Sequence, residues 1–232
     1  MKRISRKLSV ILMTVMLAVM MILSTASETQ AATTTLQKRV VTLYSSKSKN
    51  YNSFFGKYVS ANMYNIAAGP KSFKFQSLKS ADTKKATLTL KNGTGFSAGA
   101  QAVVATFKKT GNVTLSYKKE GTVNKQTFVV KKYTNPLKSF KIDGTNIASK
   151  FKKDNVYVLP YAKYAGKKIK ISYSGASNFE IDADYLLQPG NMKSDMVKNN
   201  GTVTIQKKNS ALLINAYNTK TQQNETCMVI FR

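Results

Sequence analysis

Apolar and polar residues alternate along most of the chain after residue 32, which is typical of β-strands that have one buried and one solvated face. In one such run, Ala86, Leu88 and Leu90 fall on the same face. The same period of two recurs in the segments 102–107, 113–117, 127–130, 140–142, 156–158, 169–173, 179–185, 203–205, 211–217 and 226–231. Turn-forming residues separate these runs. The pattern therefore predicts an all-β protein built from two-sheet sandwiches.

The alternation pauses at Tyr133-Thr134-Asn135-Pro136 and restarts at Phe140. Pro136 has no backbone N–H to donate to a strand ladder, so this segment is a natural domain boundary. We expect one sandwich over residues 33–135 and a second over residues 136–232. About 100 residues each is the usual size of such a domain.

Two features suggest that the second half is a copy of the first. The pattern Lys-Ser-Phe-Lys-apolar occurs at 71–75 and again at 138–142. Each half also ends in a predicted hairpin, preceded by a short strand at 102–107 or 202–207, and Tyr117 and Tyr217 occupy the same place in the two hairpins. Chance similarity between lysine-rich strands is the alternative, because a short echo is weak evidence for a repeat.

One segment departs from the strand pattern. Residues 42–70 are rich in Tyr, Asn and Ser, and apolar residues between 54 and 63 are spaced roughly as on one face of a helix. These residues are Phe54, Phe55, Tyr58, Val59 and Met63. We expect one short helix there.

The first 32 residues have the three-part layout of a secretory signal peptide. Lys2, Arg3, Arg6 and Lys7 precede the 14-residue apolar run Val10–Leu23, and small residues follow up to Ala32. A membrane-spanning helix needs about 20 apolar residues, so a short uncleaved anchor is the less favoured alternative. We therefore expect a secreted protein, free or associated with the cell wall, and no transmembrane segment in the mature chain.

The charge of the chain is strongly positive, with a formal net charge of +27. After removal of residues 1–32, 33 basic and nine acidic residues remain, and almost all of the basic ones are Lys. Such a surface attracts polyanions with a strength that falls as salt rises. The alternative is that lysines on exposed strand faces serve only solubility and block edge-to-edge aggregation.

The single cysteine excludes an intrachain disulfide. Cys227 lies in the apolar run 227–231, so we expect a buried, unreactive thiol. The chain contains no His, which removes Cys–His and Ser–His catalytic pairs, and no motif for hydrolysis or phosphate cradling is present. We expect no enzymatic activity and no cofactor.

The segments 107–115 (FKKTGNVTL) and 133–142 (YTNPLKSFKI) resemble the last hairpin and the linker of bacterial immunoglobulin-like (BIG-type) domains from secreted or surface proteins of Gram-positive bacteria. The resemblance covers 86–142 best and 155–231 more weakly. It implies two tandem immunoglobulin-like β-sandwich domains after the signal peptide. It also implies roles in adhesion, ligand binding or the spacing of other domains, and it carries over no catalytic residue.

Glu180, Asp182 and Asp184 form the only dense acidic cluster, and their spacing places them on one face of a predicted strand. Calcium binding needs six to eight oxygen ligands, usually from a curled loop, whereas a straight strand presents too few. We therefore interpret the cluster as a solvated face that balances nearby lysines, and we expect no metal site.

Aromatic and lysine residues are interleaved over 157–168, a composition that suits an acidic carbohydrate because rings stack on sugars and ammonium groups pair with anions. The candidate ligand-binding residues are Tyr157, Tyr161, Lys163, Tyr164, Lys167 and Lys168. For any single tyrosine, packing at a domain edge is the alternative. The lysine-rich stretches 117–119, 131–132, 149–153 and 163–170 would also meet phosphates, but Arg is scarce, so we expect no specific nucleic-acid recognition.

These observations favour a secreted, noncatalytic binding or adhesion module whose partner is an anionic cell-wall polymer or a host glycan. The alternative is a structural or accessory extracellular protein that binds another protein at the surface. A secreted hydrolase is the third reading, and it would require paired carboxylates across a deep cleft. The sequence does not indicate an oligomeric state.

Overall fold

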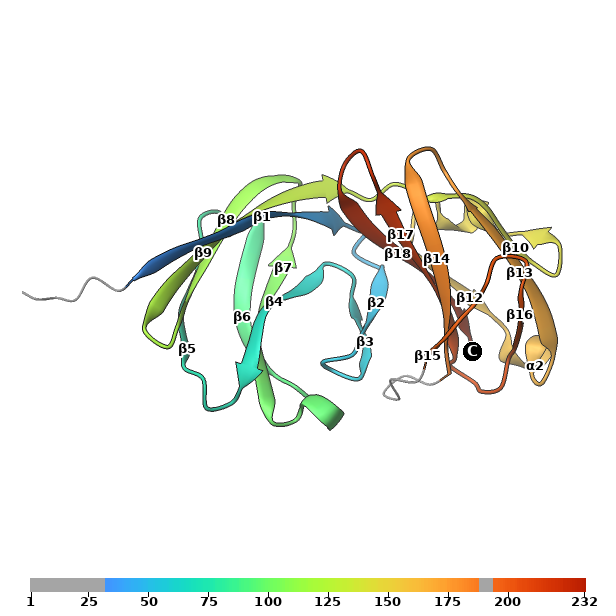
Figure 1. Cartoon of the computed structure of the whole chain (residues 1–232), viewed down its shortest axis with the longest axis horizontal. Coiled ribbons are helices and arrows are strands. Elements are labelled where there is room, and N and C mark those ends of the chain that lie inside the picture. Colours follow the sequence, from blue (N-terminus) through green and yellow to red (C-terminus); the bar gives the residue numbers. More distant parts are fainter. Residues whose placement is uncertain (1–31, 188–193) are drawn as a thin grey trace, which may run out of the picture. The chain divides into compact units, whose positions relative to one another are not determined.

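The computed structural model describes residues 32–187 and 194–232 (Figure 1). The predicted signal peptide, apart from Ala32, lies outside the described residues. Extended backbone dominates the described part of the chain, and its one α-helix, α2, spans only Tyr161–Tyr164. The all-β prediction is confirmed.

The N-terminal half contains two packed sheets. The first sheet has the order β1-β9-β8-β5, with β1 (Thr33–Leu43), β9 (Thr122–Lys132), β8 (Gly111–Lys119) and β5 (Phe75–Ser80). The second has the order β4-β7-β6, with β4 (Met63–Pro70), β7 (Ala100–Phe107) and β6 (Ala86–Asn92). A hairpin of β2 (Lys49–Asn52) and β3 (Lys57–Ser60) precedes β4, and a short 3₁₀ turn, η1 (Gly95–Ser97), precedes β7.

The C-terminal half repeats this plan. One sheet has the order β11-β10-β13-β16, with β11 (Thr145–Asn146), β10 (Leu137–Ile142), β13 (Lys168–Gly175) and β16 (Thr202–Thr204). The other has the order β12-β18-β17-β14-β15, with β12 (Val156–Leu159), β18 (Gln223–Phe231), β17 (Ala211–Asn218), β14 (Phe179–Leu186) and β15 (Ser194–Met196). A 3₁₀ turn, η2 (Ala148–Phe151), precedes β12.

The strand order identifies the fold in both halves. When β1 and β4–β9 are lettered A to G in chain order, C, F and G share one sheet and B, E and D share the other, which is the division of the immunoglobulin fold. The first strand, β1, runs parallel to the last, β9, and in the second half β12 runs parallel to β18. The described residues therefore form two tandem immunoglobulin-like β-sandwiches.

Inward-pointing residues of both sheets form the core of each half. In the first half, Phe107 of β7 and Phe128 of β9 come from opposite sheets and pack with their ring centroids 5.3 Å apart. In the second half, Phe140, Ile171 and Ile214 belong to one buried cluster and are fully inaccessible. The predicted alternation thus corresponds to real burial, since Val113, Leu115 and Tyr117 are buried along β8.

The expected short helix between residues 54 and 63 is wrong. The chain forms the β2–β3 hairpin there, and the Asn52 side chain accepts a hydrogen bond from the backbone N–H of Phe54 at 3.0 Å. Gly56 closes the turn with φ of +58°, which other residues adopt at a cost. The helix-like spacing has another cause. Phe55 lies in the turn of this hairpin, and its side chain packs into a small core cluster with Ala102 and Val104.

The predicted duplication is confirmed for the strand topology, but the two halves differ in the burial of corresponding residues. Both terminal hairpins exist, as β8–β9 and β17–β18, and Tyr117 lies opposite Asn124 just as Tyr217 lies opposite Asn224. However, Tyr117 is buried, whereas Tyr217 is 38% exposed. The same pairing within the hairpin therefore turns opposite faces toward the core in the two halves, so the two tyrosines are not equivalent.

The Lys-Ser-Phe-Lys echo does not mark equivalent strands. Its first copy, 71–75, runs through a turn into β5, whereas its second copy, 138–142, belongs to β10, the first strand of the second half. The predicted boundary near Asn135-Pro136 falls between the last strand of the first sandwich and the first strand of the second. Because residues 33–232 form one compact unit, this boundary remains a prediction.

Truncation of Phe128 to Ala removes a fully buried ring from between the sheets of the first sandwich. We expect Phe128→Ala to lower the free energy of unfolding by about 3–5 kcal/mol, the usual cost of such a cavity. Leu90→Ala is the control, since Leu90 is 39% exposed. Urea denaturation of both variants checks the prediction, and equal losses would show that this core does not hold the fold.

Candidate functional site

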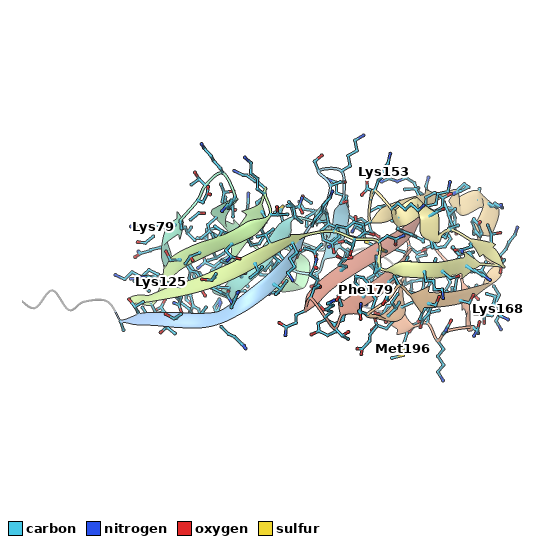
Figure 2. The ribbon with its side chains drawn as sticks, turned by 90° about the horizontal axis from the view of Figure 1, so that it is seen from above. Lys79, Lys125, Lys153, Lys168, Phe179 and Met196 are labelled. Atoms are coloured by element: carbon cyan, nitrogen blue, oxygen red, sulfur yellow. The ribbon has the colours of Figure 1, made fainter. Side chains whose placement is uncertain are left out.

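The predicted ligand-binding residues lie on three consecutive elements at one end of the second sandwich. Tyr157 belongs to β12, Tyr161, Lys163 and Tyr164 form part of α2, and Lys167 and Lys168 lie where β13 begins. The three lysines are exposed. Figure 2 shows Lys168 projecting from the ribbon at this end of the molecule.

The tyrosines of this group serve mainly to cover the core. All three are partly buried against the second sandwich's apolar cluster, and the Tyr164 ring meets Phe231 edge-on with centroids 5.5 Å apart. The Tyr161 hydroxyl donates a hydrogen bond to the carbonyl of Gln206 at 3.1 Å. Lys163 Nζ lies 5.6 Å from the centroid of the Tyr164 ring, so this ring already has a cationic neighbour.

The acidic cluster lies where the sequence pattern predicted, on the outer face of β14. Glu180 and Asp182 are exposed, and Asp184 accepts a hydrogen bond from the side-chain amide of Asn215 at 3.1 Å. Partial burial raises the pKa of the Asp184 carboxyl, and the charge of Asp182 adds to this effect. The strands β14, β17 and β18 form an open concave surface here, with a volume of about 550 Å³.

The arrangement of these acidic side chains does not favour metal binding. No group of three or more His, Cys, Asp or Glu side chains arranged to hold a metal ion occurs among the residues that the structure describes. The outward carboxylates instead face Asn215 and Tyr217 on the neighbouring strand β17.

A more elaborate arrangement lies where the two sandwiches meet. Tyr44, just after β1, and Tyr133, just after β9, pack ring against ring with centroids 5.1 Å apart. The backbone N–H of Thr226 donates to the Tyr44 hydroxyl at 2.9 Å, and the Tyr133 hydroxyl donates to the Phe151 carbonyl at 3.0 Å. Each tyrosine therefore ties the first sandwich to the second.

Further hydrogen bonds fix the same junction. The side-chain amide of Asn62 both accepts from the backbone N–H of Tyr44, at 2.7 Å, and donates to its carbonyl, at 3.1 Å. Asn155 is buried and donates to the carbonyls of Lys49 and Thr226, each at 2.9 Å. Because buried polar groups are costly unless they are paired, this network holds the two sandwiches in one arrangement.

Cys227 and Glu225 are the buried titratable groups of this junction. The prediction of a buried thiol is confirmed: Cys227 is inaccessible and burial raises its pKa to about 12. Glu225 is 1% exposed; its Oε1 accepts from the backbone N–H of Thr134 at 3.2 Å, whereas its Oε2 is buried without a partner. Burial raises the pKa of Glu225 to about 8, so the carboxyl is mostly protonated at neutral pH.

A cleft of about 380 Å³ opens beside the Tyr44–Tyr133 pair, and we call it the junction cleft. It is lined by Leu43, Tyr44, Ser45, Thr110, Lys132, Tyr133, Lys152 and Lys153. Sequence reasoning missed it as a site, although the stretches 131–132 and 149–153 drew attention to its lysines. A second cleft, of about 430 Å³, is lined by Gln37, Lys38, Val40, Val129, Lys131, Lys220, Thr221 and Gln222.

Comparisons with known proteins add a general likeness in fold. No family model and no curated protein matches the chain. Among solved structures, the tandem Ig repeats of Dlar match 84% of this chain and 94% of their own at 10% identity, with a TM-score of 0.38. Invasin, a bacterial integrin-binding protein, matches 70% of this chain and 31% of its own at 10% identity, with a TM-score of 0.24.

The fibronectin(III)-like modules of Clostridium thermocellum CbhA match 67% of this chain and 94% of their own at 13% identity, with a TM-score of 0.22. At such scores the fold assignment rests on the strand order described above. In the described ranges, no helix combines the length and the apolar character needed to cross a membrane.

The buried carboxyl of Glu225 predicts a pH-dependent stability. Its folded-state pKa, about 8, exceeds the value of 4.5 for an exposed Glu, so the folded protein binds the proton more tightly than the unfolded chain. Stability should therefore fall as pH rises from about 5 to about 8, since each pKa unit corresponds to about 1.4 kcal/mol at most.

Glu225→Gln keeps the acceptor for Thr134 and removes the titration. We expect this variant to melt several degrees above the natural chain at pH 8.5, with a much smaller difference at pH 5. Thermal unfolding over this pH range provides the measurement, and Glu180→Gln, which removes an exposed carboxylate, is the control. A difference that does not vary with pH would contradict the buried-carboxyl explanation.

Proposed function

We propose that the mature chain is a secreted, noncatalytic binding or adhesion module for anionic cell-wall or host glycans. The excess of positive charge is the observation that carries this proposal. With nine carboxylates for 33 basic side chains after residue 32, at least 24 positive charges have no carboxylate of their own. An anionic polymer supplies many negative charges at once and is the natural counterpart of such a surface.

The distribution of the charge supports the same conclusion. Residues 33–135 carry 18 basic and two acidic side chains, whereas residues 136–232 carry 15 basic and seven acidic ones. Lysines project from both sandwiches; Lys79 and Lys125 on the first and Lys153 and Lys168 on the second are labelled in Figure 2. A rigid scaffold that holds lysines at fixed positions loses little entropy when it meets an extended polymer.

The candidate ligand-binding group at 157–168 remains a proposal within this function. Lys163, Lys167 and Lys168 are exposed and contribute positive charge at one end of the second sandwich. Export through the signal peptide places the protein where wall polymers and host glycans occur. Charge-driven contact with released nucleic acid would be incidental and independent of sequence.

A structural or accessory role, in which the partner is a surface protein, is the second candidate. The exposed edge strands favour it: Met196 on the edge strand β15 is 77% exposed, and Val158 on the edge strand β12 is 48% exposed. A sheet edge with exposed apolar side chains offers another chain a place to pair. A secreted hydrolase, the third reading, would require paired carboxylates across a deep cleft, and we do not propose it.

Ionic strength separates the two candidates. Purified residues 33–232 should bind anionic wall polymers and acidic glycans, but not neutral glycans, at 50 mM salt. Most of this binding should be lost at 500 mM salt because surface charges are screened within a few ångströms. A glycan and wall-polymer array read at both salt concentrations is the measurement. Retention on cell walls that survives high salt unchanged would rule out polyanion attraction and favour a protein partner.

A further inference from the structure

The second cleft lies where the β1–β9 pair of the first sandwich meets the β17–β18 turn of the second. Val40 and Val129 are paired directly across β1 and β9, and both point outward because the next residues, Val41 and Val130, are buried. The same cleft is lined by three lysines, Lys38, Lys131 and Lys220. None of the lining residues that the structure describes is acidic or aromatic.

An irregularity in β1 brings Lys38 to this cleft. The register of β1 against β9 shifts between Leu36 and Arg39. Two residues of β1, Gln37 and Lys38, therefore share the place opposite Thr127, which is a β-bulge. Bulges redirect side chains and are rare between parallel strands. A glutamine side chain of β9 donates to the Gln37 carbonyl at 2.9 Å and so holds the bulge in place.

The β17–β18 turn presents Lys220 on a rigid backbone. The side-chain oxygen of Asn218 accepts the backbone N–H groups of Lys220, at 3.1 Å, and Thr221, at 2.9 Å. The Thr42 hydroxyl of β1 donates to the carbonyl of Asn224 at 3.0 Å, which ties this hairpin to the first sandwich. The cleft is therefore formed before any ligand arrives, and preorganisation of this kind raises affinity.

We propose that the second cleft binds a linear phosphodiester polymer with an aliphatic backbone. A phosphate lies among the three lysines, and methylene groups of the backbone lie on the Val40–Val129 pair. A wall polymer of polyol phosphate units has this chemistry, since each unit carries one negative charge and a short carbon chain. The inference rests on the proposed function and gives it a site and a ligand chemistry. The cleft volume of about 430 Å³ is within the range of about 300–1,000 Å³ that is usual for ligand sites.

The positive charge of the cleft is not neutralised within the chain. In the ranges that the structure describes, none of its three lysines forms an ion pair with a carboxylate. Lys38 and Lys220 are exposed, and Lys131 is half-buried. An ammonium group is a compact point charge that forms charge-assisted hydrogen bonds with phosphate oxygens. The exposed side-chain amides of Gln37 and Gln222 add neutral donors at the margin.

The aliphatic lining distinguishes between classes of polyanion. An acidic sugar ring gains from an aromatic platform, and single-stranded nucleic acid stacks its bases on aromatic side chains. The second cleft provides neither surface. Val40 and Val129 instead offer apolar contact to the methylene groups between two phosphates. Inorganic polyphosphate has no such groups and meets only the lysines.

The test compares variants of the mature chain, residues 33–232. Lys38→Gln/Lys131→Gln/Lys220→Gln removes the ammonium groups of the cleft. Val40→Thr/Val129→Thr keeps the charge and the β-branched shape but places hydroxyl groups on the aliphatic pair. The matched control removes three exposed lysines that lie outside both clefts and outside the 157–168 group, as Lys57→Gln/Lys91→Gln/Lys138→Gln.

The probes are a six-unit poly(glycerol phosphate), a hexamer of galacturonic acid, and inorganic polyphosphate and oligothymidylate with the same number of negative charges. Calorimetric titration at 50 mM salt gives the affinities, and thermal unfolding confirms that every variant folds. We expect the lysine variant of the cleft to lose at least tenfold in affinity for poly(glycerol phosphate), and the control less than threefold. The valine variant should lose at least threefold for poly(glycerol phosphate) and bind polyphosphate unchanged.

The outcomes separate the site, its chemistry and the proposed function. Equal losses in the cleft and control lysine variants would overturn the assignment of the site and leave the proposed function intact. A valine variant that weakens both phosphate polymers equally, or neither, would overturn the role of the aliphatic backbone. Equal or tighter binding of galacturonate or oligothymidylate would overturn the polyol phosphate chemistry. If no anionic probe binds the natural chain, the proposed function itself fails.

Discussion

The parallel pairing of the first strand with the last closes the first sandwich and positions everything at the junction. β1 lies along β9 in register from Arg39–Phe128 to Leu43–Lys132, so both strands end at the same level. The chain segments that leave these two ends therefore emerge side by side. They carry Tyr44 from one strand and Lys132 and Tyr133 from the other. The two tyrosine rings therefore lie close enough to pack together, and the junction depends on this aromatic pair.

The junction in turn substitutes for the covalent links that this chain lacks. With one cysteine, no intrachain disulfide forms, and the connection from β9 to β10 is short. Thr226 and Asn155 of the second sandwich donate hydrogen bonds to the first, and Phe151 accepts one from it, so buried or partly buried groups hold the two together. The unpartnered Oε2 of Glu225 is the weak point of this network, because only the other carboxylate oxygen, Oε1, receives hydrogen bonds.

The sequence predicted the architecture well where local pattern determines structure. Alternation along 113–117 and 211–217 reveals buried strands because the period of two is a direct consequence of the pleat. The same reasoning fails where spacing is ambiguous: Phe54, Phe55 and Met63 look helical, yet the Asn52 turn and Gly56 impose a hairpin. The hairpin pairing alone also does not determine which face of a strand is buried, which is why Tyr117 is buried and Tyr217 is exposed at matching hairpin positions.

The candidate site was harder to predict for a related reason. Sequence reasoning favoured 157–168 because tyrosines and lysines are adjacent there in the chain. In the folded protein Tyr161 and Tyr164 also pack against the core, and ligand binding by this group stays a prediction. The junction cleft is assembled from four segments, near residues 44, 110, 132 and 152, that no local window includes. The parallel pairing of β1 with β9, the pairing of Gly111 with Val130 and the Tyr133–Phe151 hydrogen bond make them neighbours.

The two explanations of the lysine excess, solubility and recognition, make different demands on position. Solubility requires only that lysines be exposed and spread, as Lys79 and Lys125 are on the first sandwich. Recognition of an anionic polymer requires instead that several ammonium groups lie within reach of one ligand. The lining of the junction cleft includes Lys132, Lys152 and Lys153 and no carboxylate, so it meets this second demand, whereas the scattered lysines meet only the first.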